Sequence, residues 1–168
     1  MIKNKAPQWN NNKMSFAKIY TRGLLGLHAP QIEVEVHISS GLPSLTIVGL
    51  PEAAVRESKD RVRSAIINSG FQFPTKRLTI NLAPADLPKD GSRLDLPIAL
   101  GILIASGQLP ENSTEGFEFI GELALDGHLR PISGALTIAM ACQQAQHCLL
   151  LPTGNLEEAN QLPDFEVY

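Results

Sequence analysis

The segment LTIVGLPEAAVRESKDRVRSAIINSG, residues 45–70, decides the fold class, because it joins a strand directly to a helix. Its first part, Leu45 to Leu50, is a short apolar run that favours a buried strand. Pro51 suits the first turn of a helix, and Ala53 to Asn68 places an apolar stripe along one helical face. Gly70 is a good stop for that helix. A strand followed by an amphipathic helix predicts an α/β domain.

The flanking segments add two strands and a second helix. Gln31 to Ser39 and Arg77 to Leu82 both alternate apolar and polar residues, which predicts strands with one buried face. Prolines and a glycine interrupt Ala83 to Arg93, which predicts a loop. Leu96 to Ser106 is apolar almost all round and predicts a buried helix, with Asp95 as its N-cap.

The last third of the chain contains shorter elements. Asp126–Gly127 is a strong two-residue turn signal, so a hairpin is predicted from Phe117–Leu125 and His128–Ile132. The other expected elements are a helix at Gly134–Gln146 capped by Ser133, a strand at Cys148–Leu151, a helix at Asn155–Gln161 and a strand beginning at Phe165–Tyr168. This order predicts a mixed α/β sandwich rather than a doubly wound parallel sheet.

Length and composition indicate one compact domain. The chain has 168 residues, of which 43% are hydrophobic, enough for a core of its own. Residues 1–13 are polar and rich in asparagine, without a signal-peptide pattern. We expect a disordered leader or an added extension there, and a domain over residues 14–168 that starts near Met14. No apolar run is long enough to cross a bilayer, so no membrane partner is expected.

The two cysteines, Cys142 and Cys148, have no neighbouring ligand pair for a metal, and a disulfide scaffold needs more of them. We expect reduced, mostly buried thiols in a cytoplasmic protein.

Charge is distributed unevenly along the chain. Residues 1–93 hold 13 of the 14 Lys and Arg against 7 acidic residues, whereas residues 94–168 hold only Arg130 against 10 acidic residues. The two parts therefore carry net charges of +6 and −9. Such a split is typical of a basic surface for nucleic acid or for an acidic partner. The alternative is that folding interleaves the two parts and leaves a mixed surface.

Two long stretches carry a family resemblance. They are GLPSLTIVGLPEAAVRESKDRVRSAIINSGFQFPTKRLTINLAPADLPKDGSRLDLPIALGILIASGQL, residues 41–109, and GELALDGHLRPISGAL, residues 121–136. Both closely resemble the N-terminal domain of ComM-type (YifB-type) proteins, a bacterial branch of the magnesium-chelatase AAA+ family. The resemblance covers nearly everything after Met14.

The resemblance implies a two-layer, mixed-sheet sandwich of the Lon-protease-domain type, which is ribosomal-protein-like. It also implies a hexameric, ring-forming AAA+ module beyond this chain, which would bind ATP and Mg. Work on single-stranded or branched DNA in recombination during natural transformation is implied as well. The expected partners are therefore DNA, the chain's own AAA+ module and neighbouring subunits.

A Lon-like fold raises the question of a Ser-Lys protease, which needs a serine nucleophile and a neutral lysine in contact. When the loop from Pro88 to Asp95 is matched to Lon without a gap, the nucleophile position falls on Arg93, and Ser92 is one residue early. The positions for the catalytic lysine are aliphatic, and no lysine follows Lys89. We therefore expect no catalytic residues in this chain.

The sequence also lacks the motifs for nucleotide binding and for metal binding. The chain contains no GxxxxGK[ST] string for phosphate binding, so we expect no ATPase activity and no cofactor here. His28, His37, His128 and His147 are scattered and have no metal-ligand spacing, and His37 is expected to face solvent. No metal site is predicted.

Binding remains. Arg56, Lys59 and Arg63 recur at three- and four-residue spacing and should share one face of a helix. The candidate DNA-binding residues are these three together with Lys76, Arg77, Lys89 and Arg93. Taken singly, each cation fits an ordinary solvated surface near Glu52, Glu57 and Asp60; as a group they favour contact with DNA or an adjacent subunit. The leading hypothesis is a non-catalytic domain that helps the motor assemble on DNA, and the rival is a module that binds only protein.

Overall fold

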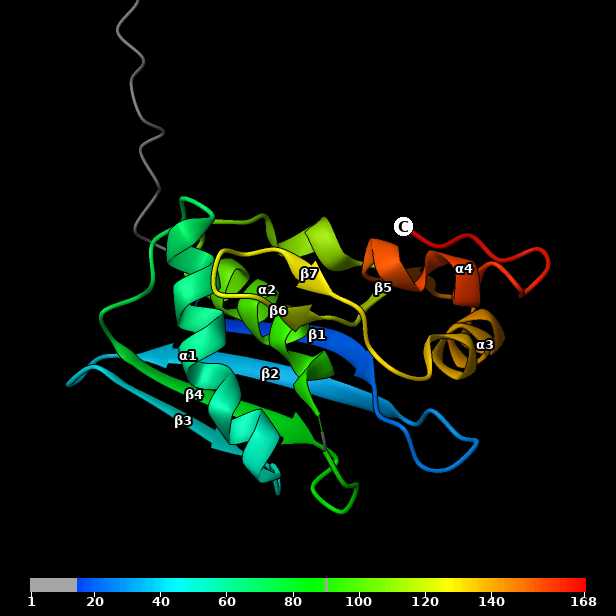
Figure 1. Ribbon diagram of the computed structural model, residues 1–168. Coiled ribbons are helices and arrows are strands. Elements are labelled where there is room, and N and C mark those ends of the chain that lie inside the picture. Colours follow the sequence, from blue (N-terminus) through cyan, green and yellow to red (C-terminus); the bar gives the residue numbers. More distant parts are fainter. Residues whose placement is uncertain (1–14, 90) are drawn as a thin grey trace, which may run out of the picture.

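A computed structural model describes residues 15–89 and 91–168, so the expected leader at residues 1–13 lies outside the described part. Its centre is a mixed six-stranded sheet in the order β3-β4-β2-β1-β5-β8 (Figure 1). The strands are β1 (Phe16–Arg22), β2 (Gln31–Ser39), β3 (Ser44–Val48), β4 (Arg77–Ala83), β5 (Phe117–Phe119) and β8 (Cys148–Leu150).

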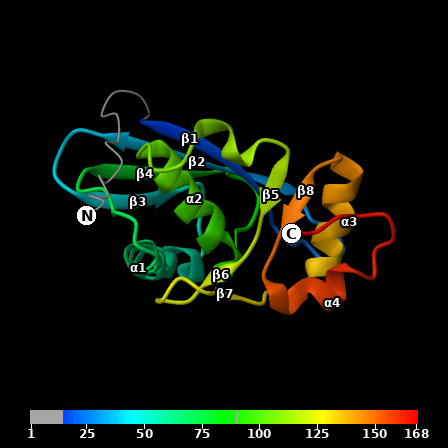
Figure 2. The same cartoon turned by 90° about the horizontal axis from the view of Figure 1, so that it is seen from above.

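Among the described residues, four α-helices and a small hairpin pack against this sheet. They are α1 (Ala53–Asn68), α2 (Asp95–Ala105), α3 (Ala135–Ala145), α4 (Leu156–Ala159) and the antiparallel pair β6 (Glu122–Leu123) and β7 (Leu129–Arg130). Figure 2 shows α1, α2 and the hairpin on one side of strands β1 to β4, and α3 and α4 gathered with β8 at one end. The mixed α/β prediction is confirmed.

Alternation of side chains explains how the sheet buries one face. In β2, Ile32, Val34 and Val36 are fully buried, and the residues between them are half-buried or exposed. His37 is exposed, as predicted. The buried side packs against α2, whose residues are apolar on nearly every side and largely buried. The same alternation defines β1, the strand that pairs with β2 along its whole length and that the sequence analysis missed.

The predicted hairpin is shorter than expected. The segment Phe117–Phe119 belongs to the main sheet, where it pairs in parallel with β1 and β8. The chain leaves the sheet at Gly121, whose amide donates to the Arg93 carbonyl just before α2 and whose carbonyl accepts from the Leu96 amide in the first turn of α2. Only β6 and β7 therefore form the hairpin around Asp126–Gly127.

The predicted cap of α3 is wrong. Gly134 occupies the N-cap position, and it has no side chain that could cap the helix. The amide of Leu136 in the first turn instead donates to the Glu158 carboxylate of α4, at 3.1 Å. A tertiary contact with Glu158 thus bonds a first-turn amide of the kind that Ser133 was predicted to cap. The final strand signal is confirmed in a minimal form, since Val167 pairs in parallel with Leu149 of β8.

Two apolar clusters fill the domain. The larger lies between the sheet and helices α1 and α2, and the smaller joins α3 and α4 to Ile120, Leu149 and Leu151. Both cysteines are free thiols, Cys142 buried and Cys148 half-buried. Within the described residues, no helix is long and apolar enough to span a membrane.

Gly101 sets how closely α2 approaches the sheet. A Cβ added there would lie 2.6 Å from Val36 Cγ2, which is too close for two carbon atoms. Alanine in a helix normally stabilises by about 1 kcal/mol relative to glycine. We predict the opposite for Gly101→Ala, a loss of about 1–3 kcal/mol from overpacking, measured by urea denaturation. In a Val36→Ala background the same change should cost much less, and an equal cost in both backgrounds would contradict this explanation.

Candidate functional site

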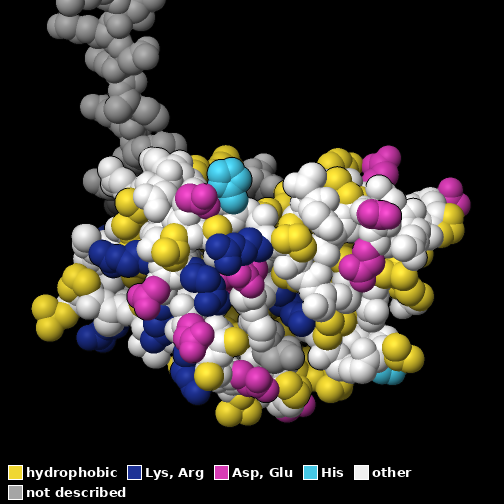
Figure 3. Space-filling view, viewed as in Figure 1, with side chains coloured by type: hydrophobic (Ala, Val, Ile, Leu, Met, Phe, Trp, Pro, Cys, Tyr) yellow, Lys and Arg dark blue, Asp and Glu magenta, His cyan; other side chains and the backbone are white. Residues whose placement is uncertain are grey.

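Helix α1 carries three of the seven predicted DNA-binding residues, Arg56, Lys59 and Arg63. Its inner face is fixed by buried residues, namely Val55, Ser58, Val62, Ala65 and Ile66. Arg56 and Arg63 are therefore exposed on the outer side, with Lys59 half-buried beside them. We call these three residues the α1 basic face. In Figure 3, Lys and Arg side chains gather over the part of the molecule that holds α1, among scattered Asp and Glu.

The cations of the α1 basic face keep their charge available. Arg56 donates to the Pro51 carbonyl at 3.0 Å, and the Arg63 guanidinium lies 4.9 Å above the centre of the Phe73 ring. Within residues 15–89 and 91–168, none of the three forms an ion pair, although Glu52, Glu57 and Asp60 are near in sequence. Neither a backbone carbonyl nor a ring neutralises a guanidinium, so all three can attract phosphate.

The other predicted DNA-binding residues are placed differently. Lys76 and Arg77 are exposed at the start of β4. Lys89 is only 1% exposed and donates its ammonium to the Pro84 carbonyl. Burial lowers the pKa of Lys89, because desolvation disfavours its charged form. Arg93 is half-buried, and its guanidinium lies 3.5 Å from the Ser133 carbonyl. Lys89 is thus separated from the surface group.

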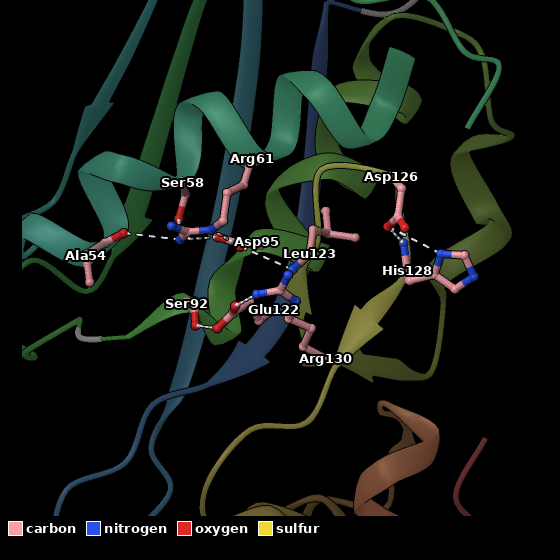
Figure 4. Close-up of polar contacts among 10 residues, drawn as sticks. All are labelled: Ala54, Ser58, Arg61, Ser92, Asp95, Glu122, Leu123, Asp126, His128 and Arg130. Atoms are coloured by element: carbon pink, nitrogen blue, oxygen red, sulfur yellow. Dashed lines mark hydrogen bonds and ion pairs between the residues drawn. The ribbon is translucent and has the colours of Figure 1, made fainter. Parts of the chain in front are cut away.

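A fourth cation of α1, Arg61, turns inward. Its Nε lies 2.7 Å from Asp95 Oδ2 and its Nη2 lies 3.1 Å from Oδ1, which is a bidentate ion pair (Figure 4). Nη2 also contacts Ser58 Oγ at 3.2 Å. The hydrogen bond to Asp95 raises the pKa of Arg61. Asp95 Oδ2 further accepts from the backbone amide of Leu123, at 3.2 Å. One carboxylate therefore ties α1 and the β6–β7 hairpin to α2.

The predicted role of Asp95 as an N-cap is wrong. Asp95 is the first residue of α2, Leu94 holds the cap position, and no side chain caps the helix. The Asp95 side chain is completely buried and its oxygens face Arg61 and Leu123. Leaving a buried carboxylate without a cation costs more free energy than leaving a helix end uncapped. The Asp95 side chain therefore pairs with Arg61 instead of capping α2.

The loop expected to correspond to the Lon active site holds a different arrangement. The Ser92 hydroxyl donates to Glu122, whose other carboxylate oxygen lies 3.5 Å from Arg130 (Figure 4). Lys89 points to Pro84 instead of Ser92. Ser92 is therefore bonded to a carboxylate and not to a lysine, which differs from the contact that a Ser-Lys pair requires.

A second buried network, which the sequence analysis missed, surrounds Glu118 in β5. Arg22 Nε and Nη2 lie 2.6 Å from its two carboxylate oxygens, and His147 Nδ1 lies 2.8 Å from Oε1. Gln31 donates to the same oxygen at 3.2 Å. Burial alone would raise the pKa of Glu118, but the hydrogen bonds from Arg22 and His147 outweigh it and lower the pKa.

This network joins the sheet to α3. Burial raises the pKa of the neighbouring Cys142 thiol to about 12, which keeps it protonated and unreactive. A shallow hollow of about 240 Å³ lies nearby, lined by Gln143, Gln146, His147, Cys148, Asp164, Phe165 and Glu166. In the described part of the chain, no three His, Cys, Asp or Glu side chains come together to hold a metal ion.

Comparison with known proteins assigns the family. Residues 34–155 match the family model described as subunit ChlI of Mg-chelatase. The chain belongs to this family. It is 56% identical over 145 residues to an uncharacterised protein, YifB, of Salmonella typhimurium, and 54% identical over 145 residues to YifB of Escherichia coli. It is also 49% identical over 155 residues to the competence protein ComM of Haemophilus influenzae.

These alignments cover 86% of this chain for each YifB protein and 92% for ComM. They cover only 29% of either YifB protein and 30% of ComM. The chain thus spans under a third of the length of these relatives. The Mg-chelatase-like, ComM-related assignment confirms the family predicted from the sequence.

The Arg61–Asp95 pair should be worth more than a helix cap. Removing one partner of a buried ion pair typically costs about 3–5 kcal/mol, whereas losing a cap costs about 1 kcal/mol. Because Arg61 is 23% exposed, we predict a loss near the lower limit, about 3 kcal/mol, for Asp95→Ala in urea denaturation. The control is Glu33→Ala, which removes an equally short but exposed pair with Lys18. It should cost less than about 1 kcal/mol. Equal losses in both variants would contradict the role of Asp95.

Glu118 should control stability in acid. Its pKa is lowered on folding, so its contribution is fully present above its ordinary pKa and is lost as the pH falls through the folded value. Glu118→Gln should reduce stability by about 3 kcal/mol at pH 7, because Arg22 stays buried without its carboxylate. The variant should also lose less stability than the wild type between pH 5 and 3. A pH dependence identical to that of the wild type would show that Glu118 is not the titrating group.

Proposed function

We propose that this chain is a non-catalytic domain of a ComM-like AAA+ ATPase and that its α1 basic face contacts DNA. The family assignment and the 49% identity to a protein named for competence support a role in natural transformation. ATP and Mg would be bound by the part of the protein beyond this chain, which contains no GxxxxGK[ST] motif.

One observation carries the DNA assignment. Of the four cations on α1, Arg61 alone is used by a carboxylate, and the three cations of the α1 basic face have no acidic partner among the described residues. Exposed cations at helical spacing match the regular negative charge of a phosphate backbone. Such contacts read no base sequence, which suits a protein that handles many DNA sequences.

The acidic half of the charge split is retained at the surface. Residues 131–168, which form α3, β8 and α4, contain four acidic residues and no Lys or Arg. In Figure 3 the end of the molecule with α3 and α4 shows Asp and Glu but no Lys or Arg, whereas the opposite part shows both signs. An acidic end repels phosphate and therefore favours an approach of DNA over α1.

The contacts of Lys89 and Ser92 support a non-catalytic role. The Lys89 ammonium donates to the Pro84 carbonyl, and the Ser92 hydroxyl donates to Glu122. Neither side chain contacts the other, so the pair needed for acyl-enzyme chemistry is not assembled. The domain would then contribute binding and assembly to the motor rather than bond cleavage.

Salt dependence tests the DNA assignment. Each phosphate contact releases counterions, so the slope of log affinity against log salt falls by about one for every contact removed. We predict that replacing Arg56, Lys59 and Arg63 together by Gln lowers affinity for a single-stranded oligonucleotide and reduces this slope by about two to three. Fluorescence anisotropy at several salt concentrations measures both quantities, in this chain and in the full-length ATPase.

The matched control changes the net charge by the same amount elsewhere. Gln144, Asn160 and Gln161 are exposed at the α3–α4 end, and their joint replacement by Glu also shifts the charge by −3. This control should keep the wild-type slope, because it removes no phosphate contact. If both triple variants behave alike, only net charge matters. If the α1 variant binds like the wild type, the DNA assignment fails and a purely protein-binding module takes its place.

A further inference from the structure

Strand β3 forms an outer edge of the sheet. It pairs in parallel with β4 along its whole length, and within residues 15–89 and 91–168 no strand pairs with its other side. Unpaired edges attract other strands, and proteins usually protect them with charges, prolines inside the strand, or bulges. Here the segment from Ile38 to Pro51 contains no charged residue, and β3 itself has neither a proline nor a bulge.

The direction of the free peptide groups follows from the pairing. The amide of Ser44 donates to Lys76 of the neighbouring chain segment, so Ser44 bonds toward β4. Peptide groups alternate sides along a strand. Leu45 and Ile47 therefore direct their amides and carbonyls outward, one residue before and one residue after Thr46. These groups are arranged symmetrically about Thr46.

That arrangement is complementary to itself. Consider two β3 strands paired antiparallel about Thr46. Leu45 of the first copy then exchanges hydrogen bonds with Ile47 of the second, and Ile47 of the first does so with Leu45 of the second. The two most exposed apolar residues beside β3 fit the same symmetry. Leu42 is 82% exposed and Leu50 is 70% exposed, and each lies four residues from Thr46. The twofold axis therefore brings the Leu42 end of one copy toward the Leu50 end of the other.

We propose that β3 is a dimerisation edge, and that its occupant is β3 of a second copy of this chain. The paired edges would join two six-stranded sheets into one. Because the segment from Ile38 to Pro51 carries no charge, no like charges stand directly opposite each other in the paired strands. The Thr46 side chains face each other across the axis, where threonine pairs stabilise sheets.

The contact should be weak. Stable interfaces bury about 1,200–2,000 Å² in total, and one short edge strand on each side buries less. We expect a dissociation constant of about 0.1 mM, so that dimers form at high local concentration. Sedimentation velocity over a range of concentrations should show a reversible shift from monomer to dimer. Thr46→Lys should abolish the shift by placing two ammonium groups opposite each other. Thr79→Lys, on the same sheet face but in the next strand, should retain it.

Cysteine trapping tests the register. Opposite residues at a non-hydrogen-bonded antiparallel position have Cα atoms about 4.5 Å apart, within the range of a disulfide. Thr46→Cys should therefore cross-link under mild oxidation, roughly tenfold faster than Val48→Cys. The two Val48 positions would lie about 13 Å apart along the paired strands. A mixture of Ser44→Cys and Val48→Cys should form a mixed dimer, because these two residues are opposite in the proposed register.

The wild-type chain, with Cys142 and Cys148, controls for disulfides of the native thiols. Thr46 and Val48 are both exposed, so the variants should fold, which circular dichroism checks. Equal cross-linking rates at Thr46 and Val48 would mean random collision and would overturn the proposal. A chain that remains monomeric at every concentration, with no cross-link at Thr46, would also overturn it and leave this edge to a strand from another protein.

Discussion

The buried carboxylate of Asp95 is the contact on which the arrangement of helices depends. Asp95 is fully buried, so its charge must be met by a cation, and Arg61 meets it with two hydrogen bonds. The amide of Leu123 completes its shell. Three separate elements, α1, α2 and the β6–β7 hairpin, are thereby held at one point. The ion pair of Arg61 thus adds to the buried residues of α1 in fixing which of its residues face outward.

A second buried carboxylate plays the same part at the other end of the sheet. Glu118 joins β5 to Arg22 of β1 and to His147 before β8. Asp95 and Glu118 lie at junctions between helices and strands. Apolar contacts alone would define the relative positions of these elements less well, because Leu, Ile and Val can repack at little cost in free energy. Directional ion pairs specify these junctions. These pairs thus attach α1 to α2 and the acidic α3–α4 end to the sheet.

Much of the fold could be predicted from local patterns. Strand β2 and helix α1 have the predicted bounds, because alternation and helical periodicity are strong in both segments. The errors arose where tertiary contacts decide. Asp95 and Ser133 were predicted as caps from the residues that follow them. In the structure, Asp95 pairs with Arg61, and Glu158 accepts from the first turn of α3. Strand β1 was missed although its alternation is visible, and the Glu118 network could be suspected only from a lone acid between Phe117 and Phe119.

For the candidate site, sequence spacing predicted the α1 basic face, but it could not separate surface cations from buried ones. Helical spacing left Arg61 out of the basic face, and the structure shows that its guanidinium pairs with Asp95. Lys89 was predicted as a DNA-binding residue like the others, and only the structure shows that it is buried and donates to a backbone carbonyl. The most direct test of this division is an NMR titration with a single-stranded oligonucleotide that follows the arginine Nε–H signals. We expect shifts for Arg56 and Arg63 and none for Arg61. Shifts confined to other surfaces, or a shift of Arg61 equal to the others, would contradict this division.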